Sequence, residues 1–430
     1  MDTWDATSII LRKRDGHRLP DDAIAWFIDA YTRGEVADEQ AAALCMAVYF
    51  QGLDGDELAT WTEAMIASGS RVDLSGLARP TVDKHSTGGV GDKISLILSP
   101  LVAACGAAVP QVAGPGLGHT GGTIDKMAAI PGWYPRLSHE RLREAMATTG
   151  CVIVSASATL APADAKLYAL RDVTGTVASI PLIASSIMSK KIASGTSALV
   201  LDVKVGRGAF MTDVDDARRL AETMVGIGRS AGVATVALLT RMDQPLGRAV
   251  GNSLEVDESI AVLRGSATDA HRPADVIEVT VALATEMLAL AGLDADPAAV
   301  LDSGAAHPLF EEMVAVQGGD LSADRPVAAT TEVVRAARSG HVQRLDAMAV
   351  GLAAMRLGAG RARKEDEIDP AVGIDCLAKE GDPVEEGQPV LAVHGNDPGR
   401  IAVAVELLAS AVDIGAEPPP PAPVVIERIE

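Results

Sequence analysis

Two glycine-rich runs, each following a strand-like stretch, constrain the fold of this chain more than any other feature. The first covers residues 84–93 (KHSTGGVGDK) and the second residues 114–126 (GPGLGHTGGTIDK). A helix-like stretch lies between the runs, at about 93–105, and a short strand pattern follows it at 108–112. Strand, glycine turn and helix in alternation are typical of an α/β domain with a mostly parallel central sheet.

Both runs place glycines beside hydroxyl groups and lysines. Glycine lets backbone N–H groups approach a ligand closely, and the hydroxyls and lysines add donors and positive charge. These are the groups that an oxyanion such as phosphate needs, so the runs predict two walls of one anion site. The alternative for the first run is a tight turn without a ligand. It is not a Walker A loop, because Ser86 and Asp92 occupy positions that need Gly and Lys.

The rest of the chain predicts three parts. Residues 19–70 read as three short helices, with Asp54 and Glu57 spaced as a capping box. Further strands are expected at 151–154, 198–203 and 233–239, and helices near 163–172, 180–194, 214–230, 275–292 and 308–317. Past about residue 335, short strands, a helix near 397–410 and a proline run at 418–423 predict a small α+β unit. The proline run is expected to be a connector to a last strand at 424–426, with an interaction motif as the alternative.

The expected fold is therefore an α/β multi-domain protein with a helical lobe and a small C-terminal α+β domain. The predicted domains are a helical lobe at 1–70 plus about 163–195, an α/β lobe at about 80–155 plus 197–335, and a C-terminal domain at about 336–430. A chain of 430 residues is too long for one ordinary core, which agrees with several domains.

Charge and composition exclude several classes of protein. A net charge of -21 argues against a nucleic-acid binder, which needs a basic face, but not against a local site for a small anion. The four cysteines show no CxxC spacing and are expected to be buried thiols. We see no signal pattern and no apolar run long enough to span a membrane, so we expect a cytoplasmic protein without membrane contact.

A second polar cluster lies in residues 163–195. Ser186 and Lys190 are four residues apart and share one face of the expected helix, and Arg171 is near the end of the preceding helix. These groups either converge on a ligand or form a solvated face, and Lys190 with Lys191 is also compatible with a plain helix end. The histidines show no metal-ligand spacing, so no metal is expected.

Several motifs together resemble the thymidine/pyrimidine-nucleoside phosphorylase family. Besides the glycine runs, the matching stretches are LAPAD (160–164), YALRD (168–172), SSIMSKK (185–191) and VKVGRGAF (203–210). The resemblance extends from about residue 10 to the C-terminus. It implies a homodimer whose active site lies between the helical and α/β domains. It also implies reversible phosphorolysis of pyrimidine (2′-deoxy)nucleosides, with inorganic phosphate as the second substrate and no cofactor. Thymidine or deoxyuridine is the expected preference.

The resemblance assigns roles to individual positions. It implies phosphate ligands at Lys84, Ser86, Ser95 and Thr123, and pyrimidine ligands at His85, Arg171, Ser186 and Lys190. Apolar contacts to the base are implied at Leu117, Val177, Ile183 and Phe210. Lys190 and Arg171 would stabilise the negative charge that builds on the leaving base, and His85 would donate to a base oxygen.

Three positions depart from the family pattern. Ala113 stands where the family has a phosphate-binding Ser, Pro115 where it usually has Arg, and Ala128 where it usually has Glu. A specialised or weakened member therefore remains an alternative. So does a nucleotide phosphorylase or phosphoribosyltransferase relative, although the transferases use an Asp-Glu pair and the nearest residues here are Asp125 and Ala128.

Lys93 carries a separate expectation. In some relatives a small residue stands at this position and a metal cation is bound nearby, held in part by a carboxylate aligned with Glu258 and carbonyls aligned with Leu246 and Ala249. We expect the Lys93 ammonium to take the place of that cation. The alternative is a solvated residue in the first turn of the following helix, where a positive charge is unfavourable.

Overall fold

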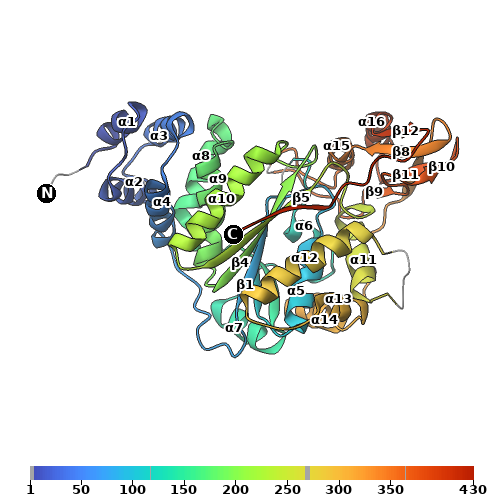
Figure 1. The fold of residues 1–430 in the computed structure, drawn as a ribbon, viewed down its shortest axis with the longest axis horizontal. Coiled ribbons are helices and arrows are strands. Elements are labelled where there is room, and N and C mark those ends of the chain that lie inside the picture. The colour runs from blue at the N-terminus through green and yellow to red at the C-terminus, as the bar shows by residue number, and fades with distance from the viewer. Residues whose placement is uncertain (1–3, 117, 267–271, 364) are drawn as a thin grey trace.

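The chain folds into an N-terminal helical bundle, an α/β part around a central sheet, and a smaller C-terminal part (Figure 1). The structure is a computed structural model that describes residues 4–116, 118–266, 272–363 and 365–430. Along its long axis the bundle lies at one end and most of the C-terminal part at the other.

The N-terminal bundle begins one helix earlier than the sequence pattern predicted. Its helices are α1 (Ala6–Arg14), α2 (Asp21–Arg33), α3 (Asp38–Gln51) and α4 (Gly55–Ala67). The capping box at the start of α4 is confirmed, because the side chains of Asp54 and Glu57 each accept the other's backbone N–H. Glu57 also pairs with the buried Lys13 at 2.8 Å, which ties α1 to α4. The ion pair therefore helps to hold the short, basic helix α1, which buries few apolar side chains, against α4.

Two later helices connect this bundle to the sheet. They are α8 (Pro162–Thr174) and α9 (Ile180–Ala193). Leu167 and Leu182 pack in the core of the N-terminal bundle, whereas Met188 and Ile192, further along α9, pack against the central sheet. The helix α9 therefore belongs to both cores.

The central sheet is built mainly from parallel strands in the spatial order β3-β2-β1-β4-β5. These strands are β1 (Val82–Ser86), β2 (Val109–Ala113), β3 (Cys151–Ser155), β4 (Ala198–Val205) and β5 (Ala234–Arg241). A parallel bridge between Thr81 and Ala108 joins β1 to β2. The helices of this part are α5 (Ile94–Ala104), α6 (Thr123–Ala128), α7 (His139–Thr148), α10 (Val214–Ser230), α11 (Asn252–Leu263), α12 (Ala274–Leu290), α13 (Pro297–Asp302) and α14 (His307–Val316). The sheet lies between a layer with α9 and α10 and a layer with α5 and α12.

The C-terminal part combines short antiparallel strands with two helices. Its elements are β7 (Thr330–Arg335), β8 (Gly340–Leu345), α15 (Ala347–Leu357), β9 (Gly373–Cys376), β10 (Pro383–Val384), β11 (Pro389–Gly395), α16 (Pro398–Leu408) and β12 (Val412–Gly415). The strand β6 (Ala249–Gly251), which follows the α/β lobe strand β5, pairs with β9 and so joins the two parts.

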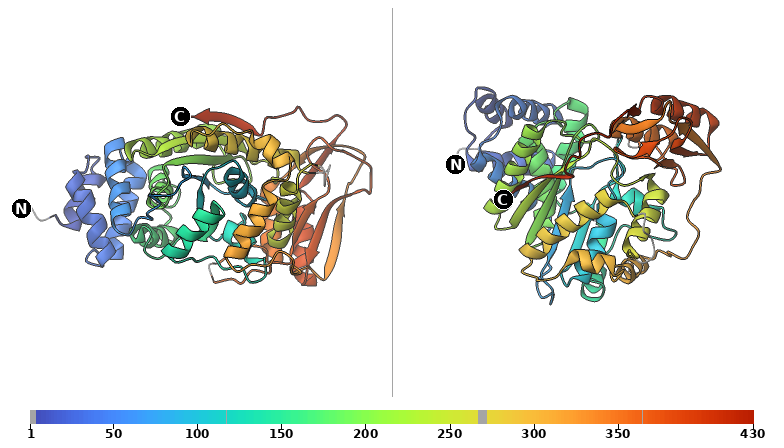
Figure 2. Two further views of the ribbon diagram at one scale, coloured as in Figure 1. Left: turned by 90° about the horizontal axis from the view of Figure 1, so that it is seen from below. Right: turned by 45° about the vertical axis from the view of Figure 1, so that its right-hand side comes forward.

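The end of the chain departs from the expected domain division. The strand β13 (Val425–Ile429) lies beside β5 in an antiparallel arrangement and extends the central sheet, although the sequence placed residues 336–430 together (Figure 2). The proline run carries the chain back across the molecule, and the open edge of β5 supplies the hydrogen bonds that a lone strand lacks. The helices α6, α7, α11 and α13 were also not predicted, because they are short or mix polar with apolar residues.

Among the helices of the described residues, none is long and apolar enough to cross a membrane.

Candidate active site

The first glycine run forms the loop between β1 and α5. Lys84 lies within β1, and Ser86 is the last residue of that strand. Ser86 Oγ donates to Asp92 Oδ2 (2.5 Å) and accepts the Gly88 N–H (3.2 Å), so its hydroxyl closes the loop. The structure thus places Lys84 and Ser86, on the same face of β1, at the carboxyl edge of the sheet.

Two buried lysines share one carboxylate beneath this loop. Lys84 Nζ lies 3.6 Å from Asp202 Oδ2, and Lys204 Nζ lies 2.7 Å from the same oxygen, with all three side chains fully buried. Thr240 donates to the other Asp202 oxygen at 2.6 Å. Lys84 Nζ has no hydrogen-bond partner among the residues that the structure describes. A buried ammonium in that state is unfavourable unless an anion or another acceptor completes its shell.

Sequence reasoning missed Asp202 and Lys204 as members of this site. They occupy alternate positions of β4, a strand that is otherwise apolar and buried throughout. Two charges of opposite sign, two residues apart in such a strand, were the available signal. The charges of Lys84 and Lys204 also act on Asp92 in the glycine loop. Burial alone would raise the pKa of Asp92, but Lys84 and Lys204 outweigh it and lower that pKa below its ordinary value.

The second glycine run packs against itself and against the C-terminal part. A Cβ atom on Gly122 would clash with the Gly116 nitrogen, so the close approach of these two loop segments requires glycine. Asp125 accepts the Gly116 N–H (2.6 Å) and a bond from Arg361 Nη1 (2.8 Å). Lys126 Nζ donates to Gly121 O (3.0 Å). Leu117, a predicted base contact, lies outside the described residues.

The other predicted phosphate residues lie near these loops. Ser95 is buried in the first turn of α5, and Thr123 is the first residue of α6. Ala113, which lacks the expected hydroxyl, ends β2 directly opposite Ser155 of β3. The Ser155 hydroxyl lies 3.4 Å from the Pro135 carbonyl.

The predicted base-binding cluster forms where α8 meets α9. Lys190 Nζ donates to Ser186 Oγ at 3.2 Å and also to the carboxylate of Asp164. Asp164 is buried, whereas the Lys190 side chain is one-third exposed. Asp164 and Ser186 therefore hold the Lys190 ammonium on one side, while part of the Lys190 side chain stays accessible to solvent. Asp164 was not predicted as a site residue, although it lies in one of the matching motifs.

Arg171 is held more tightly than the sequence suggested. Its guanidinium donates to the carbonyls of Val177 and Leu182, both at 2.9 Å, and of Thr176 at 3.4 Å. The residue is buried, and burial lowers the pKa of its guanidinium. Three of its five N–H groups are thus engaged, with two carbonyls of the loop between α8 and α9 and one in the first turn of α9. Arg171 shapes the loop that carries Val177, and its charge lies just behind that loop.

Lys191 has a structural role quite distinct from that of its neighbour. Its buried ammonium donates to Asp83 Oδ2 (2.7 Å), Lys84 O (2.7 Å) and Val112 O (2.9 Å). These bonds attach the C-terminal end of α9 to β1 and β2. The base cluster is thereby fixed next to the strand that carries Lys84.

His85 lies in β1, between Lys84 and Ser86. Burial, together with the charges of Lys191 and Lys84, lowers the pKa of His85 well below its ordinary value. The imidazole is therefore neutral at pH 7, with one N–H available as a donor.

The predicted apolar contacts differ in exposure. Val177 and Ile183 are half-buried, whereas the side chain of Phe210 is 61% exposed. The Phe210 ring lies 6.2 Å from the His119 ring, and His119 Nε2 lies 3.3 Å from Gly208 O. These contacts bring the second glycine run to the loop that follows β4.

The structure confirms the internal position expected for Lys93 and its expected partners. Its fully buried ammonium donates to Leu246 O (2.9 Å) and Ala249 O (3.0 Å) and pairs with Glu258 Oε2 (2.6 Å). Burial opposes this charge, but Glu258 and Glu255 raise the pKa of Lys93 above its ordinary value. The lysine therefore remains charged inside the protein.

Three family models match successive parts of the chain. Residues 7–69 match the helical bundle domain of the glycosyl transferase family, and residues 78–307 match its a/b domain. Residues 341–415 match the pyrimidine nucleoside phosphorylase C-terminal domain.

Curated relatives cover nearly the whole chain. Thymidine phosphorylase of Mycobacterium tuberculosis (strain H37Rv) is 54% identical over 99% of both chains. Thymidine phosphorylase of Mesorhizobium japonicum is 47% identical over 98% of both. Pyrimidine-nucleoside phosphorylase of Staphylococcus aureus (strain MSSA476) is 48% identical over 90% of this chain and 91% of its own. A crystal structure of anthranilate phosphoribosyltransferase from Thermus thermophilus shares the fold, with a TM-score of 0.56 and 20% identity over 73% of this chain and 99% of its own.

Proposed function

Because the chain belongs to the pyrimidine-nucleoside phosphorylases of the glycosyl transferase family, we propose that it catalyses the reversible phosphorolysis of pyrimidine nucleosides. Phosphate would attack C1′, the bond from C1′ to the base nitrogen would break, and the base would leave. The products would be the free base and α-(2-deoxy)ribose 1-phosphate. Thymidine or deoxyuridine is the proposed preferred substrate.

One observation carries this proposal: the buried ammonium of Lys84, without a hydrogen-bond partner among the described residues, beneath a glycine loop. Its nearest carboxylate, Asp202, lies 3.6 Å away and is shared with Lys204, which lies closer to it at 2.7 Å. A dianionic phosphate would complete this arrangement. We propose that Lys84, Ser86, Ser95 and Thr123 bind phosphate.

The base would bind on the other side, against α8 and α9. We propose that Lys190, Ser186, Arg171 and His85 bind the pyrimidine, with Val177, Ile183, Leu117 and Phe210 around it. Negative charge grows on the ring as the glycosidic bond breaks, so Lys190 would bind the transition state more strongly than the substrate. His85, neutral at pH 7, would donate a hydrogen bond to a base oxygen.

A product assay tests the proposed function. Purified protein is incubated with thymidine, deoxyuridine or uridine, with and without inorganic phosphate, and free base is measured by absorbance. We expect base release only with phosphate, and a substitution of Lys84 by Met to remove most of it. Base release that is independent of phosphate, or none from any of these nucleosides, would contradict the proposal.

We also propose that the protein is a cytoplasmic homodimer, as the family resemblance implies. Sedimentation velocity should give a species of twice the chain mass at micromolar concentration. A monomer that shows full activity at that concentration would refute the dimer.

A further inference from the structure

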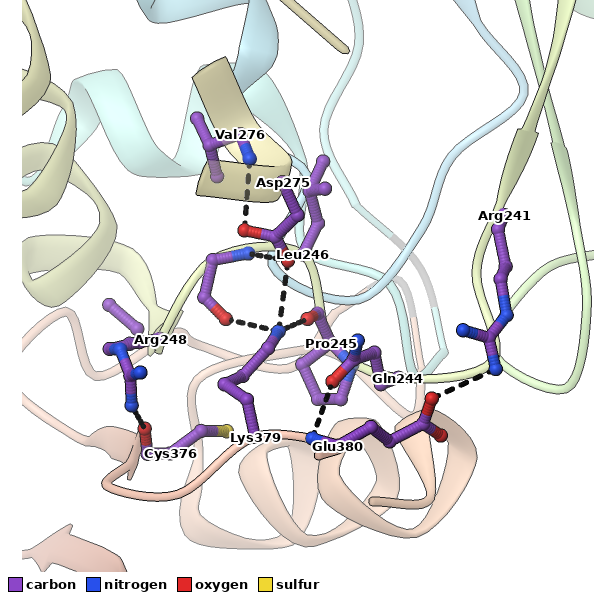
Figure 3. A network of polar contacts seen from close by, with 12 residues as sticks. Arg241, Gln244, Pro245, Leu246, Arg248, Asp275, Val276, Cys376, Lys379 and Glu380 are labelled. Atoms are coloured by element: carbon purple, nitrogen blue, oxygen red, sulfur yellow. Dashed lines mark hydrogen bonds and ion pairs between the residues drawn. The ribbon is translucent and has the colours of Figure 1, made fainter. Parts of the chain in front are cut away.

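The segment 245–249 lies between the first glycine run and the C-terminal part, and charged side chains satisfy most of its peptide groups. It follows β5 and ends with the first residue of β6. Figure 3 shows Pro245, Leu246 and Arg248 of this segment. Leu246 N donates to Val90 O of the glycine run at 3.0 Å. Glu258 accepts the N–H groups of Arg248 (2.9 Å) and Ala249 (3.2 Å).

Two lysines approach this segment from opposite parts of the protein. Lys93, at the end of the glycine run, donates hydrogen bonds to the carbonyls of Leu246 and Ala249. Lys379, from the C-terminal part, donates hydrogen bonds to the carbonyls of Pro245 and Gly247, the latter at 2.8 Å. Lys379 also bonds Asp275 Oδ2 at 3.0 Å, which itself accepts the Gly247 N–H at 3.1 Å (Figure 3).

The alternation of these contacts couples the two lysines. Neighbouring carbonyls of one short segment accept from different ammonium groups, so both lysines hold the same stretch of backbone. The segment also packs directly on the glycine run, because a Cβ atom on Gly91 would lie 2.5 Å from Leu246 O. Segment geometry and phosphate-loop geometry are therefore linked by contact.

We propose that Lys379 is a positioning residue for the phosphate half of the site, acting through segment 245–249 and Lys93 on the first glycine run. The inference rests on the proposed function. Lys379 touches no reacting group, and its effect would be to hold the loop that binds phosphate in its productive shape.

Attachment of the C-terminal part does not depend on Lys379 alone. Arg241 pairs with Glu380 at 2.9 Å, and the Arg248 side chain donates to the Cys376 carbonyl (Figure 3). Arg248 also donates to the carbonyl of Leu377. Glu380 therefore offers a matched control. It lies next to Lys379 and links the same two parts, but its side chain bonds Arg241 rather than segment 245–249.

The test compares Lys379→Met with Glu380→Gln by steady-state kinetics in which phosphate and thymidine are varied separately. We expect Lys379→Met to raise the KM for phosphate roughly fivefold or more while the KM for thymidine changes less than about twofold. Glu380→Gln should change neither. Lys93→Met should have a similar effect, and the double variant Lys93→Met/Lys379→Met should be less than additive, because both act on one segment.

Two further measurements keep the result interpretable. Lys379→Met removes the ion-pair partner of Asp275. If that variant folds poorly, Lys379→Met/Asp275→Asn removes both charges and should show the same phosphate effect. Amide hydrogen exchange in 88–93 should be faster in the Lys379 variants than in Glu380→Gln, whatever the activity. Unchanged exchange with an unchanged phosphate KM in a folded variant would overturn the positioning role. Wild-type protein that releases no base would instead refute the proposed function, and the exchange data would still decide whether Lys379 holds the loop.

Discussion

At the scale of single residues, the buried lysines of the candidate site differ in the hydrogen bonds that their ammonium groups make. Lys191 and Lys93 each bond a carboxylate and two backbone carbonyls. Lys84 has neither kind of hydrogen bond among the described residues, although it is equally buried. Lys204 Nζ also lacks a hydrogen-bond partner there, but it lies 2.7 Å from Asp202, whereas Lys84 lies 3.6 Å from that carboxylate. The proposal that Lys84 binds an anion rests on this difference.

Lys190 and Lys191 offer a direct comparison of these two roles. Lys190→Met should lower kcat by about a hundredfold or more, because it would remove the charge proposed to face the leaving base. It should lower the melting temperature less than Lys191→Met does, because the Lys190 side chain is one-third exposed whereas the Lys191–Asp83 pair is buried on both sides. Lys191→Met should lower the free energy of unfolding by about 3–5 kcal/mol, because it strands the buried carboxylate of Asp83. Thermal unfolding and turnover measured on both variants check this. Equal stability losses in the two would show that the assigned roles are wrong.

His85 predicts a dependence of stability on pH. The folded-state pKa of His85 lies well below the ordinary 6.5, so the unfolded chain binds the proton more readily as the pH falls through 6.5. Stability should therefore decrease from pH 7.5 to pH 5, by at most about 1.4 kcal/mol per pH unit from this group. His85→Asn should flatten the curve of unfolding free energy against pH, and the exposed His17→Asn should not. A wild-type slope retained in His85→Asn would exclude this contribution.

At the scale of elements, most of the α/β part could be predicted because strand, glycine turn and helix follow local sequence rules. The helix expected at 93–105 is observed as α5, and the strand expected at 151–154 as β3. The helix α11 was missed because its polar residues, including Glu255 and Glu258, satisfy partners distant in sequence.

The candidate site was predicted less completely, for the same reason. Motif resemblance pointed to Lys84 and Lys190, but their carboxylate neighbours Asp202 and Asp164 are brought close only by the tertiary fold. Likewise, the engagement of Arg171 with three carbonyls depends on the loop conformation after α8, which no local pattern specifies.

The pairing of β13 with β5 leads to a prediction at the same scale. Deleting residues 418–430 should expose the edge of β5 and remove the ion pairs Arg218–Glu427 and Arg428–Glu286. We expect a melting temperature lower by several degrees, since about 1 kcal/mol corresponds to roughly 2–4 °C in large domains. Calorimetry checks this, with Glu427→Gln as a control for the charge alone. An unchanged melting temperature in the truncated chain would contradict a stabilising role for β13.

At the scale of the whole molecule, the proposed phosphate residues and the proposed base residues lie on parts that three connections join. The connections near 68–81, 156–161 and 194–197 run between the helical bundle and the sheet, and Lys191 fixes one end of α9 beside them. We propose that the outer part of the bundle, which lies away from this anchored end, moves relative to the sheet.

We predict that phosphate and a pyrimidine nucleoside together draw the lobes closer, because each half of the site holds one substrate and closure excludes water. Small-angle scattering should show a smaller radius of gyration with both ligands than with either alone. A Lys190→Met variant should close less. Identical scattering profiles in all states would argue against domain closure.

The most direct test of the central claim is calorimetric titration of inorganic phosphate into the wild-type protein and into Lys84→Met. We predict saturable binding of one phosphate per chain in the wild type. In the folded variant we predict an affinity lower by roughly tenfold to a hundredfold, as expected for the loss of a charged hydrogen bond. Equal phosphate affinity in both proteins would contradict the assignment of the buried Lys84 ammonium as the phosphate partner.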